Sequence, residues 1–118
     1  MIKTGLLTVF FSLAMNTGYA EYVGPAADYP TQITVVDAKQ LENDARLSLK
    51  GFITGRLRGD HYLFRDGSGE IGVEIDGEVW RGAKIGPDTN VILYGELERE
   101  SGSVYVDVHR LEVIGDGR

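Results

Sequence analysis

The clearest alternation of apolar and polar residues along the chain lies within Asp60–Trp80. The second half of this stretch has a two-residue period that predicts a half-buried strand over Glu70–Asp76, its apolar face formed by Ile71, Val73 and Ile75. A first strand is predicted over His61–Asp66, and the glycines of Gly67–Gly69 are expected to supply positive φ in the turn. A lone hairpin has nothing to bury its apolar face against, so the rest of the chain must pack on it.

The same period predicts three further strands. Residues Leu47–Arg58 are too many for an average strand, and its apolar face is expected to contain Leu47, Leu49, Gly51, Ile53, Gly55 and Leu57. Glycine on the inner face of a long strand predicts a sharp bend, which lets one strand pair with two neighbours. Asn90–Glu100 and residues 104–114 are predicted to form a second hairpin, with inward positions at Val91, Leu93, Gly95, Leu97, Val104, Val106 and Val108.

Two short segments favour helix or irregular turns. Thr34, followed three residues later by Asp37, resembles a capping box and predicts a two-turn helix that covers one open end of the sheet. Its inner face would contain Val35, Ala38 and Leu41. Residues 77–86 are expected to form a short helix or an irregular turn that plugs the other end, using Val79, Trp80, Ala83 and Ile85.

The predicted order is helix, long bent strand, hairpin, short helix, hairpin. Five strands with a helical element between the third and the fourth are the layout of an OB-fold barrel. The sequence therefore predicts an all-β fold with short helices: a five-stranded OB-fold barrel over residues 34–118, preceded by a short N-terminal helix. A chain of 118 residues suits one such domain.

The first twenty residues differ from the remainder. Lys3 is followed by an apolar run of about ten residues, Leu6–Met15, which is well short of the ~20 that span a bilayer. Small residues at Gly18 and Ala20 complete a signal peptide, predicted to be cleaved after Ala20 for export to the periplasm. The alternative is a buried N-terminal helix or strand. Residues 21–33 are predicted to be an extended N-terminal segment, and no membrane span is predicted in the mature chain.

Composition narrows the chemistry. There is no cysteine, so disulfides and thiolate metal sites are excluded. The formal net charge is −6, and an acidic body repels phosphate backbones, so nucleic acid is not the expected partner.

Four motifs also resemble a known family: Tyr62–Asp66, Gly69–Ile71, Val73–Asp76 and Trp80–Gly82. They are similar to the bacterial OB-fold (BOF) family, which includes the YgiW/YdeI-type stress-tolerance proteins of the periplasm. The resemblance extends from about residue 34 to residue 114 and includes the signal peptide. It implies an exported, non-enzymatic OB barrel that binds a ligand. Gly77 stands where an acidic residue is common in the family, so a carboxylate cluster there would be thinner.

OB barrels commonly bind ligands on the second and third strands and in the flanking loops. The candidate ligand-binding residues are therefore Arg56, Arg58, His61, Tyr62, Arg65, Glu74 and Asp76. They predict a mixed-charge groove for a small polar or cell-wall-derived ligand. The alternative is a solvated face with exposed cross-strand ion pairs, each worth less than about 1 kcal/mol.

Two other chemistries deserve comparison. The acidic run Asp66, Glu70, Glu74, Asp76 and Glu78 suggests cation binding, although it lacks the spacing of a calcium loop, so no dedicated metal site is predicted. Asp107 and His109 would face the same side and could belong to a hydrolytic triad, but no serine lies in a recognisable nucleophile motif.

The sequence thus predicts a periplasmic OB-fold binding or adaptor protein that contributes to envelope stress tolerance. It would bind a small envelope ligand or an envelope protein, without catalysis and without a cofactor. The alternatives are a cation-binding protein of the envelope and a small hydrolase that uses His109.

Overall fold

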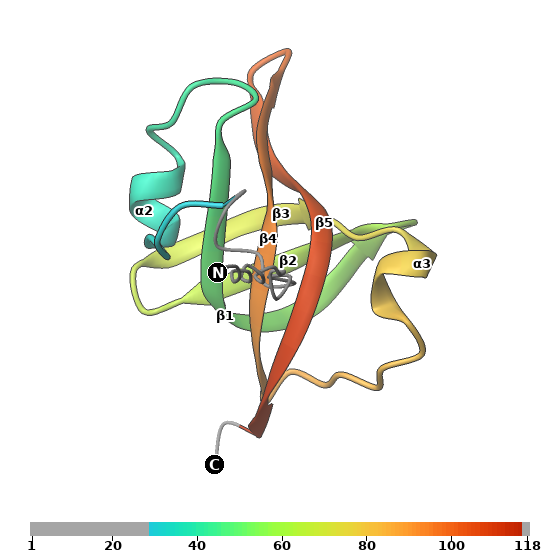
Figure 1. The fold of residues 1–118 in the computed structure, drawn as a ribbon. Coiled ribbons are helices and arrows are strands. Elements are labelled where there is room, and N and C mark those ends of the chain that lie inside the picture. The colour runs from blue at the N-terminus through green and yellow to red at the C-terminus, as the bar shows by residue number, and fades with distance from the viewer. Residues whose placement is uncertain (1–28, 117–118) are drawn as a thin grey trace, which may run out of the picture.

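The computed structural model describes residues 29–116, which form a closed barrel of five strands (Figure 1). The strands are β1 (Arg46–Arg58), β2 (His61–Asp66), β3 (Gly69–Glu74), β4 (Thr89–Glu100) and β5 (Ser103–Asp116). Helix α2 (Val35–Ala38) precedes the barrel, and α3 (Gly77–Trp80) connects β3 to β4. The order around the barrel is β1-β2-β3-β5-β4, which confirms the predicted OB fold. The predicted signal peptide and residues 21–28 lie outside the described residues.

Strand β1 bends so that it pairs with two neighbours. Its first half, Arg46–Phe52, pairs antiparallel with β4, and its second half, from Phe52 onward, pairs antiparallel with β2. Gly51 lies at the bend, where a Cβ atom would overlap the carbonyl oxygen of Arg65 on β2. The inner-face glycine at this position is therefore required for closure, as the sequence predicted.

The predicted alternation is correct as far as Ile53 and wrong beyond it. Gly55 is exposed, with open space where a side chain would stand, and Leu57 is 59% exposed rather than part of the core. The reason is two register shifts, between Ile53 and Gly55 and between Arg56 and Arg58. Each shift reverses which side chains face inward, so a strict two-residue period cannot continue to the tip of the β1–β2 hairpin.

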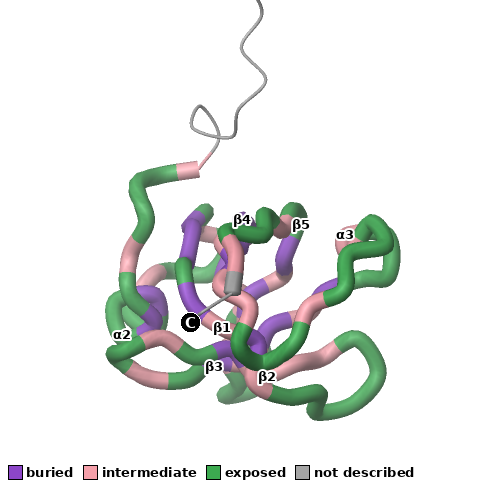
Figure 2. Tube along the Cα trace, turned by 90° about the horizontal axis from the view of Figure 1, so that it is seen from below, coloured by how far each residue is buried: buried purple, intermediate pink, exposed green. Residues whose placement is uncertain are grey.

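The core lies inside the barrel and beneath α2. Figure 2 shows that most of the buried segments belong to the strands and α2, whereas α3 and most of the loops are exposed or half-buried. The buried apolar residues include most of the predicted inward positions: Val35, Ala38, Leu47, Leu49, Ile53, Ile71, Val73, Ile75, Val91, Leu93, Leu97, Val106 and Val108. Phe64 of β2 also belongs to the core, whereas Leu41 and Val104, both expected to face inward, are only half-buried. Among the described residues, no helix has the length and apolar content needed to cross a membrane.

Helix α2 is a single turn, shorter than the two turns predicted. Thr34 caps it as expected, since its Oγ1 accepts a hydrogen bond from the Asp37 N–H at 3.1 Å. A second cap comes from the β2–β3 turn, where Asp66 Oδ2 accepts from the Val35 N–H at 2.8 Å. The other carboxylate oxygen of Asp66 accepts from the N–H and hydroxyl of Ser68 and from the Gly69 N–H.

These bonds also correct the predicted turn chemistry. Neither Gly67 nor Gly69 has positive φ. The turn is held by the Asp66 side chain, which folds back onto the N–H groups that follow it. Partial burial alone would raise the pKa of Asp66, but the hydrogen bonds from Ser68, Val35 and Gly69 outweigh it and lower the pKa below its usual 3.8.

Helix α3 and the residues after it close the opposite end of the barrel. Val79, Trp80 and Ile85 pack partly buried against the core, and the Trp80 ring meets the Tyr62 ring edge-on at 5.2 Å. Ala83, which was expected to join them, is exposed. The helix ends because Arg81 takes the left-handed conformation, with φ of 51°.

Replacement of Asp66 by asparagine should lower the free energy of unfolding by about 1 kcal/mol at pH 7, since an amide has one acceptor oxygen in place of two. The folded pKa lies below the unfolded value, so this contribution is present above pH 3.8 and is lost as the pH falls through the folded pKa. Urea unfolding of Asp66→Asn and wild type at pH 7 and in acid would measure the difference. Asp88→Asn, in an exposed loop, is the matched control; an equal loss there would contradict the expectation.

Replacement of Gly95 by alanine should destabilise the barrel by about 2 kcal/mol or more, because the added Cβ would overlap the carbonyl oxygen of Asp107 on β5. Gly86→Ala serves as the control, since open space surrounds that position and its effect should stay within about 0.5 kcal/mol. Thermal unfolding of both variants is the measurement, and similar melting temperatures would show that β4 and β5 can move apart without cost.

Candidate ligand-binding site

A cleft of about 720 Å³ opens where β3 and β5 separate. The two strands pair in parallel over three residues, from Gly72 opposite Tyr105 to Glu74 opposite Asp107. The chain then turns away from the sheet into α3, while β5 continues along β4. Figure 1 shows α3 standing to one side of β5. The wedge between them is lined by Asp76, Glu78, Val79, Arg81, Asp107, Val108, His109, Arg110 and Leu111.

The walls of this cleft carry both signs of charge. The α3 side contributes two carboxylates and a guanidinium, from Asp76, Glu78 and Arg81. The β5 side contributes a carboxylate, an imidazole and a guanidinium, from Asp107, His109 and Arg110. The volume is that of a typical small-ligand site. An arrangement of this kind suits a ligand with both cationic and anionic groups, because either charge alone would meet repulsion from part of the lining.

A bulge in β5 places two of these side chains on the same face. Tyr94 pairs with Arg110, but the next residue of β4, Gly95, pairs with Val108, so His109 is an additional residue. The guanidinium of Arg110 lies 5.0 Å above the Tyr94 ring, and His109 contacts Asp107, both on the outer face of the barrel. Without the bulge, consecutive side chains would point to opposite faces.

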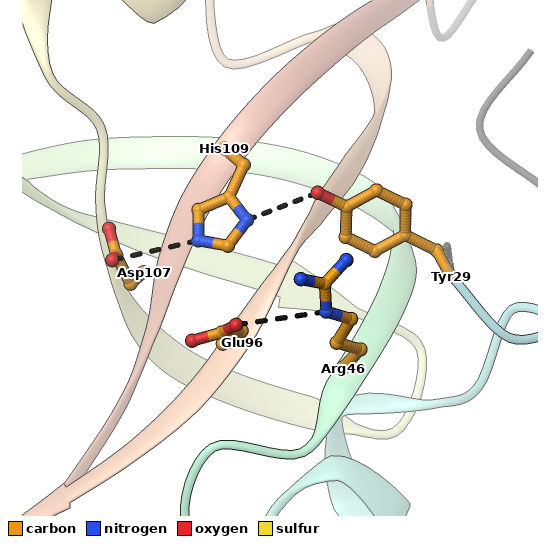
Figure 3. Close-up of polar contacts among 5 residues, drawn as sticks. All are labelled: Tyr29, Arg46, Glu96, Asp107 and His109. Carbon is orange, nitrogen blue, oxygen red and sulfur yellow. Dashed lines mark hydrogen bonds and ion pairs between the residues drawn. The ribbon is translucent and has the colours of Figure 1, made fainter. Parts of the chain in front are cut away.

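A chain of polar contacts holds His109 beside the cleft (Figure 3). Its Nδ1 is hydrogen-bonded to the Tyr29 hydroxyl at 3.0 Å, and its Nε2 lies 3.7 Å from a carboxylate oxygen of Asp107. The guanidinium of Arg46 lies 5.5 Å from the centre of the Tyr29 ring, and its Nε is 3.7 Å from Glu96. Both nitrogens of the imidazole therefore face partners that fix its orientation.

The same contacts attach the described part of the N-terminal segment to the barrel. The ring of Tyr29 packs against Tyr94 at 5.5 Å, and the Pro30 carbonyl accepts a hydrogen bond from the Ser48 hydroxyl. Ile33 forms a parallel bridge with Leu49 at the edge of β1. Residues 29–33 thus cross the outer face of the barrel next to the cleft.

A second group of side chains gathers carboxylates on the outer face of β4. Ligand oxygens of Asp44, Glu96 and Glu98 lie within 4.8 Å of one another. Burial raises the pKa of Glu98, and the nearby charges of Asp44, Asp107, Glu96 and Glu100 raise it further. This acidic group is the part of the described surface most suited to a hard cation.

Three of the predicted ligand-binding residues share the outer face of β2 and β3. His61 lies opposite Glu74, and Arg65 lies opposite Glu70. The imidazole of His61 also meets the Tyr105 ring at 5.7 Å. These pairs form a continuous polar face beside the cleft, because Glu74 lies opposite Asp107 on β5.

The remaining predicted residues lie elsewhere. Arg56 stacks over Tyr62, with its guanidinium 5.8 Å from the ring centre, and donates a hydrogen bond to the Gly59 carbonyl at 2.9 Å. Arg58 lies opposite His61 at the tip of the β1–β2 hairpin, and the two residues line a second, smaller pocket of about 300 Å³ with Leu57. Only Asp76 lines the cleft. Sequence reasoning missed Arg81 and Arg110 and considered His109 only as a catalytic base. A bulge that leaves no sequence signature determines the placement of Arg110.

The structure also bears on the two alternatives, cation binding by the acidic run and hydrolysis that uses His109. Asp66, the first residue of the acidic run, accepts hydrogen bonds from the turn and from α2 with both oxygens. His109 does lie beside Asp107, as expected from their spacing, but the hydroxyl hydrogen-bonded to it within the described residues belongs to Tyr29 and not to a serine. A serine hydrolase arrangement therefore lacks its nucleophile there.

Comparison with known proteins gives close relatives. The chain is 41% identical over 95 residues to the calcium-regulated OB-fold protein CarO of Pseudomonas aeruginosa, covering 80% of this chain and 81% of that protein. It is 37% identical over 81 residues to protein YgiW of Escherichia coli K12, covering 69% of this chain and 62% of YgiW. The chain thus matches less than two thirds of the length of YgiW.

The fold agrees with these relatives. The solved structure of the hypothetical protein ygiW from E. coli superposes with a TM-score of 0.71 at 35% identity, covering 73% of this chain and 95% of that one. The family described as "Bacterial OB fold (BOF) protein" matches residues 13–113. This protein belongs to the bacterial OB-fold (BOF) family.

Proposed function

We propose that this protein is a periplasmic binding protein that holds a small polar or cell-wall-derived ligand in the cleft between α3 and β5 and catalyses no reaction. The observation that carries the proposal is the mixed-charge lining of that cleft, with Asp76 and Glu78 on one wall and Arg110 on the other. Export after cleavage at Ala20 is part of the proposal and rests on the pattern of the first twenty residues.

The position of the cleft supports this reading. It adjoins β3, and OB barrels commonly bind ligands on and around their second and third strands. Cell-wall fragments carry amino and carboxylate groups together, which match the two signs of charge across the cleft. The polar face of His61, Arg65 and Glu74 continues from the cleft and would contact a larger ligand or an envelope protein.

The proposed physiological role is a contribution to envelope stress tolerance. It is supported by two findings: the chain belongs to the bacterial OB-fold family, and its motifs resemble those of the YgiW/YdeI-type stress-tolerance proteins. A binding or adaptor role needs no nucleophile, in agreement with the hydrogen bond between His109 and Tyr29.

Cation binding by the acidic group of β4 is a second candidate. The observation that favours it is the convergence of Asp44, Glu96 and Glu98. A relative that is called a calcium-regulated OB-fold protein makes calcium the first ion to test. Three carboxylates fall short of the six to eight oxygens that Ca²⁺ prefers, so we expect weak binding completed by water.

The ligand proposal predicts that peptidoglycan fragments, which carry amino and carboxylate groups together, thermally stabilise the mature protein more than polyamines or neutral sugars do. A ligand at 100 times its Kd would stabilise the fold by about 2.7 kcal/mol. The double variant Asp76→Asn with Glu78→Gln should lose most of the shift in a melting assay. Asp37→Asn with Glu42→Gln removes two exposed carboxylates outside the cleft and should keep it. Equal losses in both variants would contradict a site in the cleft.

The cation candidate predicts two effects of Glu98→Gln. Because the folded pKa of Glu98 is raised, its charge destabilises the fold above that pKa, and the penalty disappears below the unfolded value of 4.5. The variant should therefore melt higher than wild type at pH 7 and equally at pH 4. It should also lose any calcium-induced shift at pH 7, whereas Glu70→Gln, exposed on β3, should retain it. A calcium shift unchanged in Glu98→Gln would exclude this group as the site.

A further inference from the structure

One wall of the cleft is formed by main chain. Val108 lines the cleft although the whole residue is only 3% exposed. Because its side chain belongs to the core, its main chain lies on the cleft side. Within residues 29–116, β5 beyond Asp107 pairs only with β4. A strand paired on one side leaves main-chain N–H and C=O groups unpaired on the other, although the bulge at His109 interrupts their regular alternation here. The cleft thus contains an unpaired strand edge over Val108–Leu111.

Helix α3 lies opposite this edge without satisfying it. No backbone hydrogen bond among the described residues joins residues 76–81 to β5. The space between them is about 720 Å³. Four residues of a regular strand span about 13 Å. The additional residue at His109 shortens this edge, so an extended chain of about five residues is long enough to cover it. Such a chain would lie where β3 would have continued had it not turned into α3.

The charges of the cleft indicate which chain fits. Asp76, Glu78 and Asp107 would attract a cationic side chain, and Arg81 and Arg110 would attract an anionic one. Side chains on one face of an extended peptide recur every second residue. A peptide with a basic and an acidic residue on the same face, separated by an even number of positions, can therefore meet both groups.

We propose that the ligand class of this cleft is an extended peptide, which adds to β5 as a strand over Val108–Leu111. The inference rests on the proposed binding function of the same cleft and narrows its ligand. Main-chain hydrogen bonds would supply affinity along the edge, and the charged walls would supply specificity. The occupant takes the place beside β5 that β3 leaves after Glu74.

The probes are two acetylated and amidated pentapeptides, Lys-Val-Thr-Val-Glu and its reverse. Calorimetry should detect binding of at least one of them to the mature protein, and hydrogen exchange should slow at amides within 108–111. Each peptide is also made with N-methyl groups at odd or at even positions. In one of these two methylated series, the methyl groups block the N–H groups that face β5, and binding should weaken at least about tenfold. The peptide methylated at the alternate positions should bind as tightly as the unmethylated parent.

Arg81→Glu should weaken the parent peptide about tenfold or more, because it removes an attractive charge and adds a repulsive one. Lys84→Glu makes the same charge change on an exposed residue outside the cleft and should leave the affinity within about twofold. Equal binding of the peptides methylated at odd and at even positions would overturn strand addition. Binding of wall fragments without binding of any peptide would overturn this inference and leave the proposed function standing. If neither class binds, both fail.

Discussion

Closure of the barrel depends on how closely β5 approaches β4 and β3 around Asp107. There β4 supplies Gly95, whose missing side chain leaves room for the main chain of Asp107, and β3 supplies only three residue pairs. At the same level β5 gains its additional residue, His109, and β3 turns off toward α3. Tight packing on one side of β5 and separation on the other thus occur within a few residues. The cleft is a product of barrel closure and not of an appended loop.

Carboxylates of three strands lie side by side at this level, since Asp107 of β5 is opposite Glu74 of β3 and Glu96 of β4. Burial raises the pKa of Tyr105, and the charges of Glu100, Glu74, Glu98 and Asp107, on β3, β4 and β5, raise it further. Polyanions are repelled from such a surface, whereas cationic or zwitterionic ligands are tolerated. The guanidinium groups in the cleft are what turn this acidic surface into a site of mixed charge.

Sequence reasoning predicted the fold well and the site poorly, for one physical reason. The inward valines of β5 alternate regularly up to Val108, and the two-residue period sufficed to place them in the core. The same period would send Arg110 inward, but the bulge at His109 returns it to the outer face. The register shifts of β1, between Ile53 and Gly55 and between Arg56 and Arg58, made the prediction for that strand wrong in the same way. Register depends on contacts between distant strands, so a pattern within one strand cannot reveal it.

The cap of α2 has a consequence for the order in which the protein folds. One helical turn has too few hydrogen bonds to persist alone, and the carboxylate that stabilises its first N–H belongs to Asp66, 31 residues further along the chain. Val35 therefore acquires its partner only after the β2–β3 hairpin has formed. We expect α2, although it is the first element of the described chain, to be among the last to become ordered during refolding, with its backbone protected later than the hairpin that anchors it.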